Sequence, residues 1–245
     1  MAEYPDLIPA SGLQLTTMAK RSVVSRVWTM ASGVPRTRRE VRASLHLLAS
    51  LRACGWHRSL NAGTPMNALG EPQPWLTYPV VRWLETVLTP ATRVFEYGAG
   101  SSTAWFARAG RIKEIISVEH DAGWFAALPQ PPNGKILHIP YRGTWWDAGE
   151  DSPYVRAIAD GAPWDVVVVD GMARTACARL ADTYLSAAGL VILDDTDKPE
   201  SVPAQEALTS RGLGRLDFWG LKPGLGTQRC TTVFGRDINA WVCRN

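Results

Sequence analysis

The sequence predicts an α/β protein with a Rossmann-like, doubly wound sheet of seven strands. The sheet is expected to be mostly parallel with an antiparallel last strand, and a helical extension precedes it. Three observations predict this fold. Short β-rich runs alternate with helical stretches from residue 75 onward. A glycine-containing turn joins the first β-rich run to a helix that begins with hydroxyl residues. The last two β-rich runs follow each other with only a loop between them, which favours antiparallel pairing at an edge.

The N-terminal part, residues 1–74, is expected to be a basic helical extension, and residues 75–245 are expected to form the main domain. Helical patterns occur over 20–30 and 38–54, and Gly55 can end the second of these helices. A loop rich in Gly, Pro and Asn spans 61–74 and is expected to lie over the carboxyl edge of the sheet.

The main domain begins with a helix over 80–88 and then alternates strands with helices. The run WDVVVV at 164–169 is apolar on both faces, as buried parallel strands are. The other β-rich runs lie at 94–95, 115–118, 135–139, 190–193, 215–219 and 231–234, and the other helices are expected after residue 101 and over 122–128, 154–160, 174–185 and 202–211.

Composition limits the function. Hydrophobic residues make up 46% of the 245, and the net charge of +3 argues against nucleic acid as the main partner. Residues 1–60 contain nine Lys or Arg and three acids, which gives that segment +6 and leaves −3 for the rest. This basic segment is either a solvated helical face or a surface for an acidic substrate or partner.

The four cysteines have no metal-binding spacing, so we expect a reduced, cytoplasmic chain. No apolar run approaches the ~20 residues that a membrane helix needs. The expected partner is a small-molecule or peptide-like substrate, with no nucleic acid and no membrane. A homodimer stays open.

Acidic residues follow the predicted strands directly. Ligands of a doubly wound sheet bind outside the carboxyl ends of its strands, so these acids should converge on one site. They are Glu96, Glu119, Asp170 and the pair Asp194–Asp195.

The glycine turn reads GAGSST from Gly98 to Thr103. A dinucleotide-binding turn would have a third glycine where Thr103 stands, and a P-loop would end in Gly-Lys-Ser/Thr. Glu119 lies 21 residues after Gly98, which suits an acid that binds ribose hydroxyls. A ligand with an adenosine and no diphosphate fits best, and S-adenosylmethionine is such a ligand.

With these motifs in place, about residues 75–235 resemble class I S-adenosylmethionine-dependent methyltransferases. The stretches PWLTYP, FEYGAGSST, SVEHD and DFWGLKPG…CTTVF resemble a bacterial subgroup without a defined reaction. The resemblance implies that the glycine turn holds the methionine part of the cofactor and that Glu119 holds the ribose. Glu96 would orient the turn or meet the methionine amine. The other cofactor contacts implied are Gly98, Gly100, Ser101, Ser102, Thr103, His120 near the adenine, Asp170, and Thr77 and Tyr78 as lid contacts.

The acids at the far side suggest a metal. Three carboxylates at adjacent strand ends would raise one another's pKa, and a hard divalent cation would relieve the repulsion. The pattern of Asp170, Asp194 and Asp195 resembles metal-dependent O-methyltransferases of the catechol and macrocin types, in which Mg²⁺ activates a substrate hydroxyl. A lysine expected three residues after the first Asp is Ala173 here. The alternative is that Asp194 contacts cofactor or solvent, Asp195 caps the next helix, and no metal binds.

The expected function is O-methylation of a small-molecule or peptide-like, natural-product acceptor. Asp170, Asp194 and His120 are the candidate catalytic residues. Two other enzyme classes share the scaffold: aminopropyl transferases, whose acidic pair binds a polyamine, and nicotinamide-dependent oxidoreductases. A non-catalytic protein that docks a partner through its basic N-terminal helices is the remaining alternative.

Overall fold

The computed structural model describes residues 37–149 and 151–241, so the helix expected over 20–30 lies outside the described residues. The chain divides into two compact units, Met1–Leu48 and Ala49–Asn245, each considered by itself below. The boundary expected between residues 74 and 75 stays a prediction. None of the helices in the described ranges is long and apolar enough to cross a membrane.

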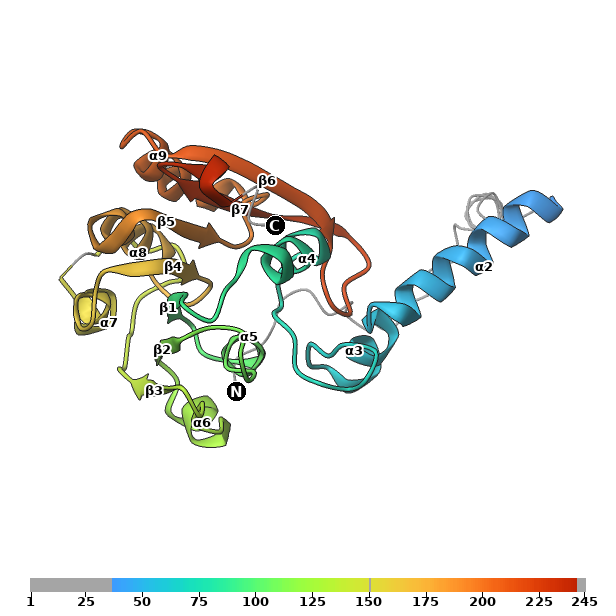
Figure 1. Ribbon diagram of the computed structural model, residues 1–245, viewed down its shortest axis with the longest axis horizontal. Coiled ribbons are helices and arrows are strands. Elements are labelled where there is room, and N and C mark those ends of the chain that lie inside the picture. The colour runs from blue at the N-terminus through green and yellow to red at the C-terminus, as the bar shows by residue number, and fades with distance from the viewer. Residues whose placement is uncertain (1–36, 150, 242–245) are drawn as a thin grey trace, which may run out of the picture. The chain divides into compact units, whose positions relative to one another are not determined.

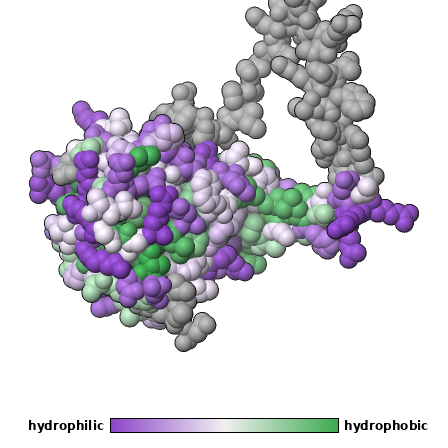
Figure 2. All heavy atoms as spheres, turned by 90° about the horizontal axis from the view of Figure 1, so that it is seen from above, coloured by the Kyte–Doolittle hydropathy of each residue, from purple (hydrophilic) through white to green (hydrophobic). Residues whose placement is uncertain are grey.

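Helix α2 spans Arg38–Ala53 and begins with a capping box. The backbone N–H of Thr37 donates to the Glu40 carboxylate at 2.9 Å, and the N–H of Glu40 donates to the Thr37 hydroxyl at 3.1 Å. No residue of α2 is buried, and Figure 2 shows hydrophobic side chains along the helix beside hydrophilic ones near its start. Its apolar side chains Val41, Leu45, Leu47 and Leu48 are exposed.

The second unit is built on a seven-stranded sheet in the order β3-β2-β1-β4-β5-β7-β6 (Figure 1). The first five strands of the chain pair in parallel. Strand β7 lies antiparallel between β5 and β6, so the expected antiparallel last strand is confirmed. The strands are β1 Arg93–Tyr97, β2 Glu114–Glu119, β3 Gly134–His138, β4 Trp164–Val169, β5 Leu185–Leu193, β6 Gly214–Leu221 and β7 Gln228–Gly235.

Alternating side chains on the central strands give the sheet two apolar faces. Phe95, Val167 and Val191 face a core that includes helices α7 (Pro153–Arg156), α8 (Arg174–Ala181) and α9 (Val202–Thr209). Val94 and Val166, one residue earlier on β1 and β4, face the opposite core with α4 (Tyr78–Val87) and α5 (Ser101–Phe106). Helices therefore cover both faces, which confirms the doubly wound α/β fold.

Some local expectations were wrong. Helix α3, Trp56–Ala62, was not expected, and its last two residues lie in the stretch 61–74 that was expected to be loop. Strand β5 begins at Leu185, five residues before the β-rich run expected at 190–193, so the turn that Ala188–Gly189 suggests is strand, with a register irregularity against β4. The expected helix over 174–185 ends as the short 3-10 helix η2, Asp182–Tyr184. The remaining helix of the parallel part is α6, Ala122–Ala127, and the other 3-10 helices are η1 Ala157–Ala159, η3 Pro199–Ser201 and η4 Ile238–Trp241.

Hydrogen bonding continues past the strand ends and aligns the acidic residues. The Asp170 N–H donates to the Tyr97 carbonyl at 3.1 Å, and the Asp194 N–H donates to the Val169 carbonyl at 3.2 Å. The Gly98 N–H donates to the Val118 carbonyl at 2.9 Å. The ends of β1, β2, β4 and β5 thus lie side by side at one edge, where the candidate site forms.

Candidate functional site

The turn after β1 is shaped by close contact with the turn after β4. Gly98 has a φ of 91°, and a Cβ at this position would lie 2.7 Å from the Gly171 Cα. A Cβ on Gly171 would in turn meet the Tyr154 hydroxyl at 2.1 Å. Only glycine satisfies both the backbone conformation and the contact. The two strand ends are therefore held together without side chains between them.

Glu96 organises the glycine turn from below. Its buried Oε2 accepts hydrogen bonds from the Thr103 hydroxyl and from the Ser117 hydroxyl, the latter at 2.7 Å. The Thr103 hydroxyl also accepts the Gly100 N–H at 3.0 Å. Burial raises the pKa of Glu96, and the hydroxyls of Ser102, Thr103 and Ser117 oppose the rise. The Oε1 atom is buried and has no hydrogen-bond partner among the described residues, which leaves an acceptor for a ligand donor such as an amine.

Glu119 ends β2 beside this turn. Its Oε1 accepts the backbone N–H groups of His120 and Asp121, both at 2.8 Å, and lies 2.9 Å from His120 Nδ1. The adjacent carboxylate of Glu119 raises the pKa of His120, and burial opposes this rise. Among the described residues, Glu119 Oε2 has no hydrogen-bond partner, so one carboxylate oxygen remains for a ligand hydroxyl.

Two tryptophans border the turn and the end of β2. The Trp124 indole donates to the Ala99 carbonyl at 2.8 Å, and its side chain is 45% exposed rather than part of the core. Trp145 is 49% exposed, and its ring centroid lies 6.3 Å from that of His120. Both rings are exposed near the end of β2, where a flat ligand ring could stack on them.

The acids after β5 form a cluster of charges on the far side of Asp170. The Lys222 ammonium, buried at the end of β6, binds both Asp194 Oδ2 and Asp195 Oδ1. The Thr231 hydroxyl donates to Asp194 Oδ1 at 2.7 Å, and Lys198 lies 3.0 Å from Asp195 Oδ2. Burial would raise the pKa of Asp195, but Lys222 and Arg174 hold it below its usual range. Burial lowers the pKa of Lys222, and its two carboxylate partners more than offset this.

Arg174 joins this cluster to Asp170. Its guanidinium lies 2.9 Å from Asp170 Oδ1 and donates to the carbonyls of Gly171, Asp170 and Asp194. It also lies over the rings of Trp145 and Trp146, at 5.6 and 5.2 Å from the ring centroids. Ala173, which precedes it, and Asp195 have the positive φ angles 52° and 57°. Strained backbone of this kind is typical of functional sites.

Asp170 is the acid of the cluster that is open to a ligand. Its side chain is 25% exposed, and among the described residues its Oδ2 has no hydrogen-bond partner. Burial raises the pKa of Asp170, the neighbouring Asp194 raises it further, and Arg174 opposes the rise. A carboxylate with a raised pKa is suited to accept a proton from a substrate.

The residues present do not fit the predicted magnesium site. The ammonium of Lys222 lies between the carboxylates of Asp194 and Asp195, and the guanidinium of Arg174 binds Asp170. Among residues 37–149 and 151–241, no group of three His, Cys, Asp or Glu side chains is placed to hold a metal ion. Asp195 does not cap a helix either, because its carboxylate binds Lys222 and Lys198.

The expected lid residues, Thr77 and Tyr78, contact parts of the chain other than the glycine turn. Thr77 is fully buried, and it donates its N–H to the Thr231 hydroxyl and its hydroxyl to the Phe218 carbonyl. It therefore adjoins the acid cluster rather than the glycine turn. The buried Tyr78 hydroxyl lies next to Cys54 and Gln73, and burial raises its pKa. Ser101 starts α5, and its hydroxyl makes no hydrogen bond to a described residue.

Sequence reasoning missed Lys222 and the role of Arg174. Lys222 lies 27 residues after Asp195 in a β-hairpin, so no local spacing connects the two. The signal available was the Lys-Pro-Gly sequence at a turn between two late strands. Arg174 lies four residues after Asp170, at the start of a helix. It was missed because the residue expected there was a lysine three residues after the Asp.

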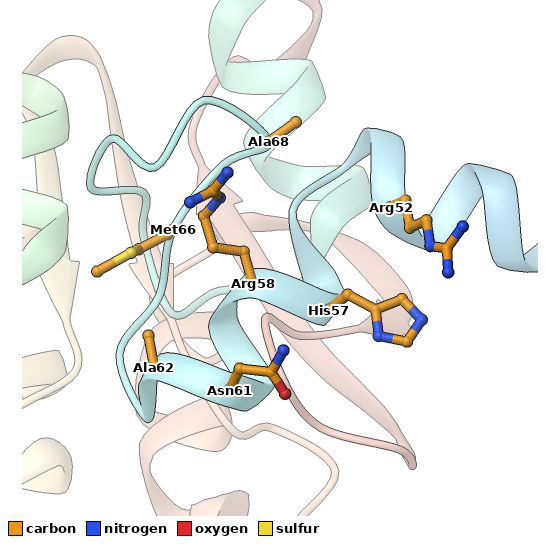
Figure 3. Close-up of a pocket in the computed structure, with 7 residues that line it drawn as sticks. All are labelled: Arg52, His57, Arg58, Asn61, Ala62, Met66 and Ala68. Atoms are coloured by element: carbon orange, nitrogen blue, oxygen red, sulfur yellow. The ribbon is translucent and has the colours of Figure 1, made fainter.

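An open depression of about 610 Å³ lies around α3, and its lining contains no carboxylate (Figure 3). Arg52, His57 and Arg58 contribute the basic side chains, and Arg58 points towards the loop that carries Met66 and Ala68. Within the described residues, neither arginine makes an ion pair. A second depression, near Arg211, differs in that its lining contains a carboxylate, that of Glu206.

Comparison with known proteins gives structural similarities only. No protein-family model and no curated protein matches the chain. A methyltransferase from Pyrococcus furiosus is 17% identical, with 78% of this chain and 98% of that chain covered and a TM-score of 0.45. A precorrin-6y C5,15-methyltransferase from Geobacter metallireducens is 13% identical, with 67% and 92% covered and a TM-score of 0.49. A spermidine synthase from Thermotoga maritima is 13% identical, with 67% and 59% covered and a TM-score of 0.45. Scores this low carry no information on the activity of this chain.

Proposed function

We propose that the protein is an S-adenosylmethionine-dependent methyltransferase. The proposal rests on the position of two acids, Glu96 and Glu119, at one glycine turn. Glu96 Oε1 is an unused acceptor under the turn, and Glu119 keeps Oε2 for a ribose hydroxyl. Thr103 occupies the place of the third glycine of a dinucleotide site and is engaged by Glu96 and Gly100. The site thus offers contacts for an amino acid and a ribose without a diphosphate cradle.

Isothermal titration with S-adenosylmethionine and S-adenosylhomocysteine tests the cofactor. Both should bind, and Glu119→Gln should weaken binding about 5- to 150-fold, since a lost hydrogen bond to a buried group costs ~1–3 kcal/mol. Glu114→Gln, at the opposite end of β2, is the matched control and should bind like the unchanged protein. Binding of NAD in preference to both ligands would sink the assignment.

We propose Asp170 as the residue that positions or deprotonates the acceptor. It stands directly after β4, next to the Gly171–Gly98 contact, and its Oδ2 is available. Because the sulfonium is a good leaving group, methyl transfer mainly requires the protein to align the nucleophile. An acceptor hydroxyl would give up its proton to Asp170, and an acceptor carboxylate would need no base. His120 lies at the ribose side beside Glu119, which favours a cofactor contact over catalysis.

The basic depression at α3 supports an acceptor that carries an anionic group. Two arginines and a histidine surround it without a compensating carboxylate, so an anion would gain charge-assisted hydrogen bonds there. Transfer of labelled methyl groups into an anion-exchange-fractionated small-molecule extract tests this. The labelled product should come from the strongly retained fractions, and Arg58→Gln should raise the acceptor KM with little change in kcat. Label confined to unretained, neutral fractions would contradict it.

Aminopropyl transfer is less well supported. An acidic pair that binds a polyamine must be free to do so, whereas Asp194 and Asp195 already bind Lys222. Decarboxylated S-adenosylmethionine offered with putrescine should therefore give no spermidine.

A further inference from the structure

Lys222 reaches the acid cluster through a rigid turn between β6 and β7. The turn closes with the Leu225 N–H donating to the Lys222 carbonyl at 3.1 Å, and Gly224 has a φ of 73°. Pro223 followed by a glycine with positive φ is the sequence of a type II turn. The lysine therefore stands at a fixed point at the end of β6, not on a flexible loop.

Two tryptophans fasten this turn to the segment that precedes the sheet. The Trp75 indole donates to the Pro223 carbonyl at 3.0 Å, and the Trp56 indole donates to the Leu225 carbonyl at 2.8 Å. A Cβ on Gly224 would lie 3.1 Å from the Leu60 nitrogen, so α3 packs directly on the turn. The turn that begins with Lys222 is thus fixed by both tryptophans and by α3.

The charges of the cluster balance without an added ion. Three carboxylates, those of Asp170, Asp194 and Asp195, face three cations. Lys222 and Arg174 are buried, and Lys198 is partly exposed at the rim. A buried ammonium between two carboxylates satisfies the same electrostatic need as a divalent cation.

We propose that Lys222 takes the position of the divalent cation of a metal-dependent site and makes this acid cluster metal-independent. It is a positioning residue: it holds Asp194 and Asp195 ionised and in place, and leaves Asp170 as the acid that faces the acceptor. The inference about the acceptor rests on the proposed function, whereas the exclusion of a metal ion by Lys222 does not.

The proposal predicts that removal of the ammonium uncovers a cation site. We would titrate Mn²⁺ and Mg²⁺ into the full chain by calorimetry and follow bound Mn²⁺ by electron paramagnetic resonance. The unchanged protein should show no saturable binding at millimolar metal. Lys222→Met keeps the length of the side chain without its charge, and it should bind Mn²⁺ at least tenfold more tightly than the unchanged protein. Mg²⁺ should also raise its melting temperature.

Lys198→Met is the matched control, because Lys198 binds Asp195 from the exposed rim. It should gain no metal site. If Lys222→Met does not fold without metal, it would be refolded in Mn²⁺ and compared with the double variant Lys222→Met with Asp194→Asn, in which one carboxylate is removed together with the ammonium. The double variant should fold, and it should bind Mn²⁺ more weakly than the refolded Lys222→Met protein. Saturable Mn²⁺ binding by the unchanged protein that Asp194→Asn abolishes would overturn the proposal. So would a folded Lys222→Met protein that binds no metal. Titration with S-adenosylmethionine reports on the proposed function separately.

Discussion

Gly98 and Gly100 lie two residues apart in the same turn, yet their backbones have different requirements. Gly98 combines a φ of 91° with contact to Gly171, while Gly100 has extended backbone. A Cβ on Gly100 would meet only Trp124, at 3.9 Å. The fold therefore requires glycine at the first position, whereas no described residue requires it at the second.

Alanine at each glycine should separate these roles. Gly98→Ala should lower the free energy of unfolding by at least ~2 kcal/mol, through strain and backbone contact. Gly100→Ala should change it by less than about 0.5 kcal/mol, but weaken binding of S-adenosylmethionine about tenfold or more, because a methyl group would stand at the ligand surface. Urea unfolding and calorimetric titration measure the two effects. Unchanged affinity in Gly100→Ala would show that the ligand does not lie against this turn.

His120 should make stability depend on pH. Its pKa in the folded protein is raised by the Glu119 carboxylate, whose Oε1 lies 2.9 Å from His120 Nδ1, above an unfolded value of about 6.5. The stabilising contribution is therefore fully present below about pH 6.5 and is lost as pH rises through the folded pKa. The difference in unfolding free energy between the unchanged protein and His120→Asn should be larger at about pH 6 than at about pH 9. Equal differences at both pH values would contradict the proposed interaction of His120 with Glu119.

The turn after β6 is the element on which the acid cluster depends, and its glycines provide a test. Gly224→Ala would place a methyl group against α3 at a positive φ, and should cost about 1–3 kcal/mol of stability. Gly226→Ala is the control within the same hairpin, since no atom lies within 4 Å of its added Cβ. Its effect should stay within about 0.5 kcal/mol. Equal losses in both variants would mean that α3 does not support the turn.

At the scale of elements, the sequence predicts best where one periodicity dominates. The run WDVVVV is β4 to the residue, because an unbroken apolar β-branched run fits a buried parallel strand. Strand β5 was predicted too short, because Ala188–Gly189 resembles a turn locally, although the strand begins at Leu185, which pairs with Trp164 of β4. Helix α3 was missed for a similar reason: its short sequence has little periodicity, and its packing against Gly224 comes from a distant hairpin.

At the scale of the whole molecule, the acidic strand ends could be predicted because topology alone aligns the carboxyl ends of parallel strands. The cations that pair with these acids could not be predicted. Lys222 comes from the β6–β7 hairpin, and Arg174 begins α8 directly after Ala173, whose φ is 52°. The magnesium prediction counted the carboxylates but not the cations that the tertiary fold brings to them.

Because the cofactor contacts would come from the ends of β1, β2 and β4, ligand binding should stabilise the sheet as one body. S-adenosylmethionine at about 100 times its Kd should raise the free energy of unfolding by ~2.7 kcal/mol. Hydrogen exchange should slow in α4 and in α8, which lie on opposite faces of the sheet. Glu119→Gln at the same ligand concentration should gain less, in proportion to its weaker binding, while Glu114→Gln should gain the full amount. Protection confined to one face would mean that the ligand binds to the surface of that layer and not at the shared edge of the strands.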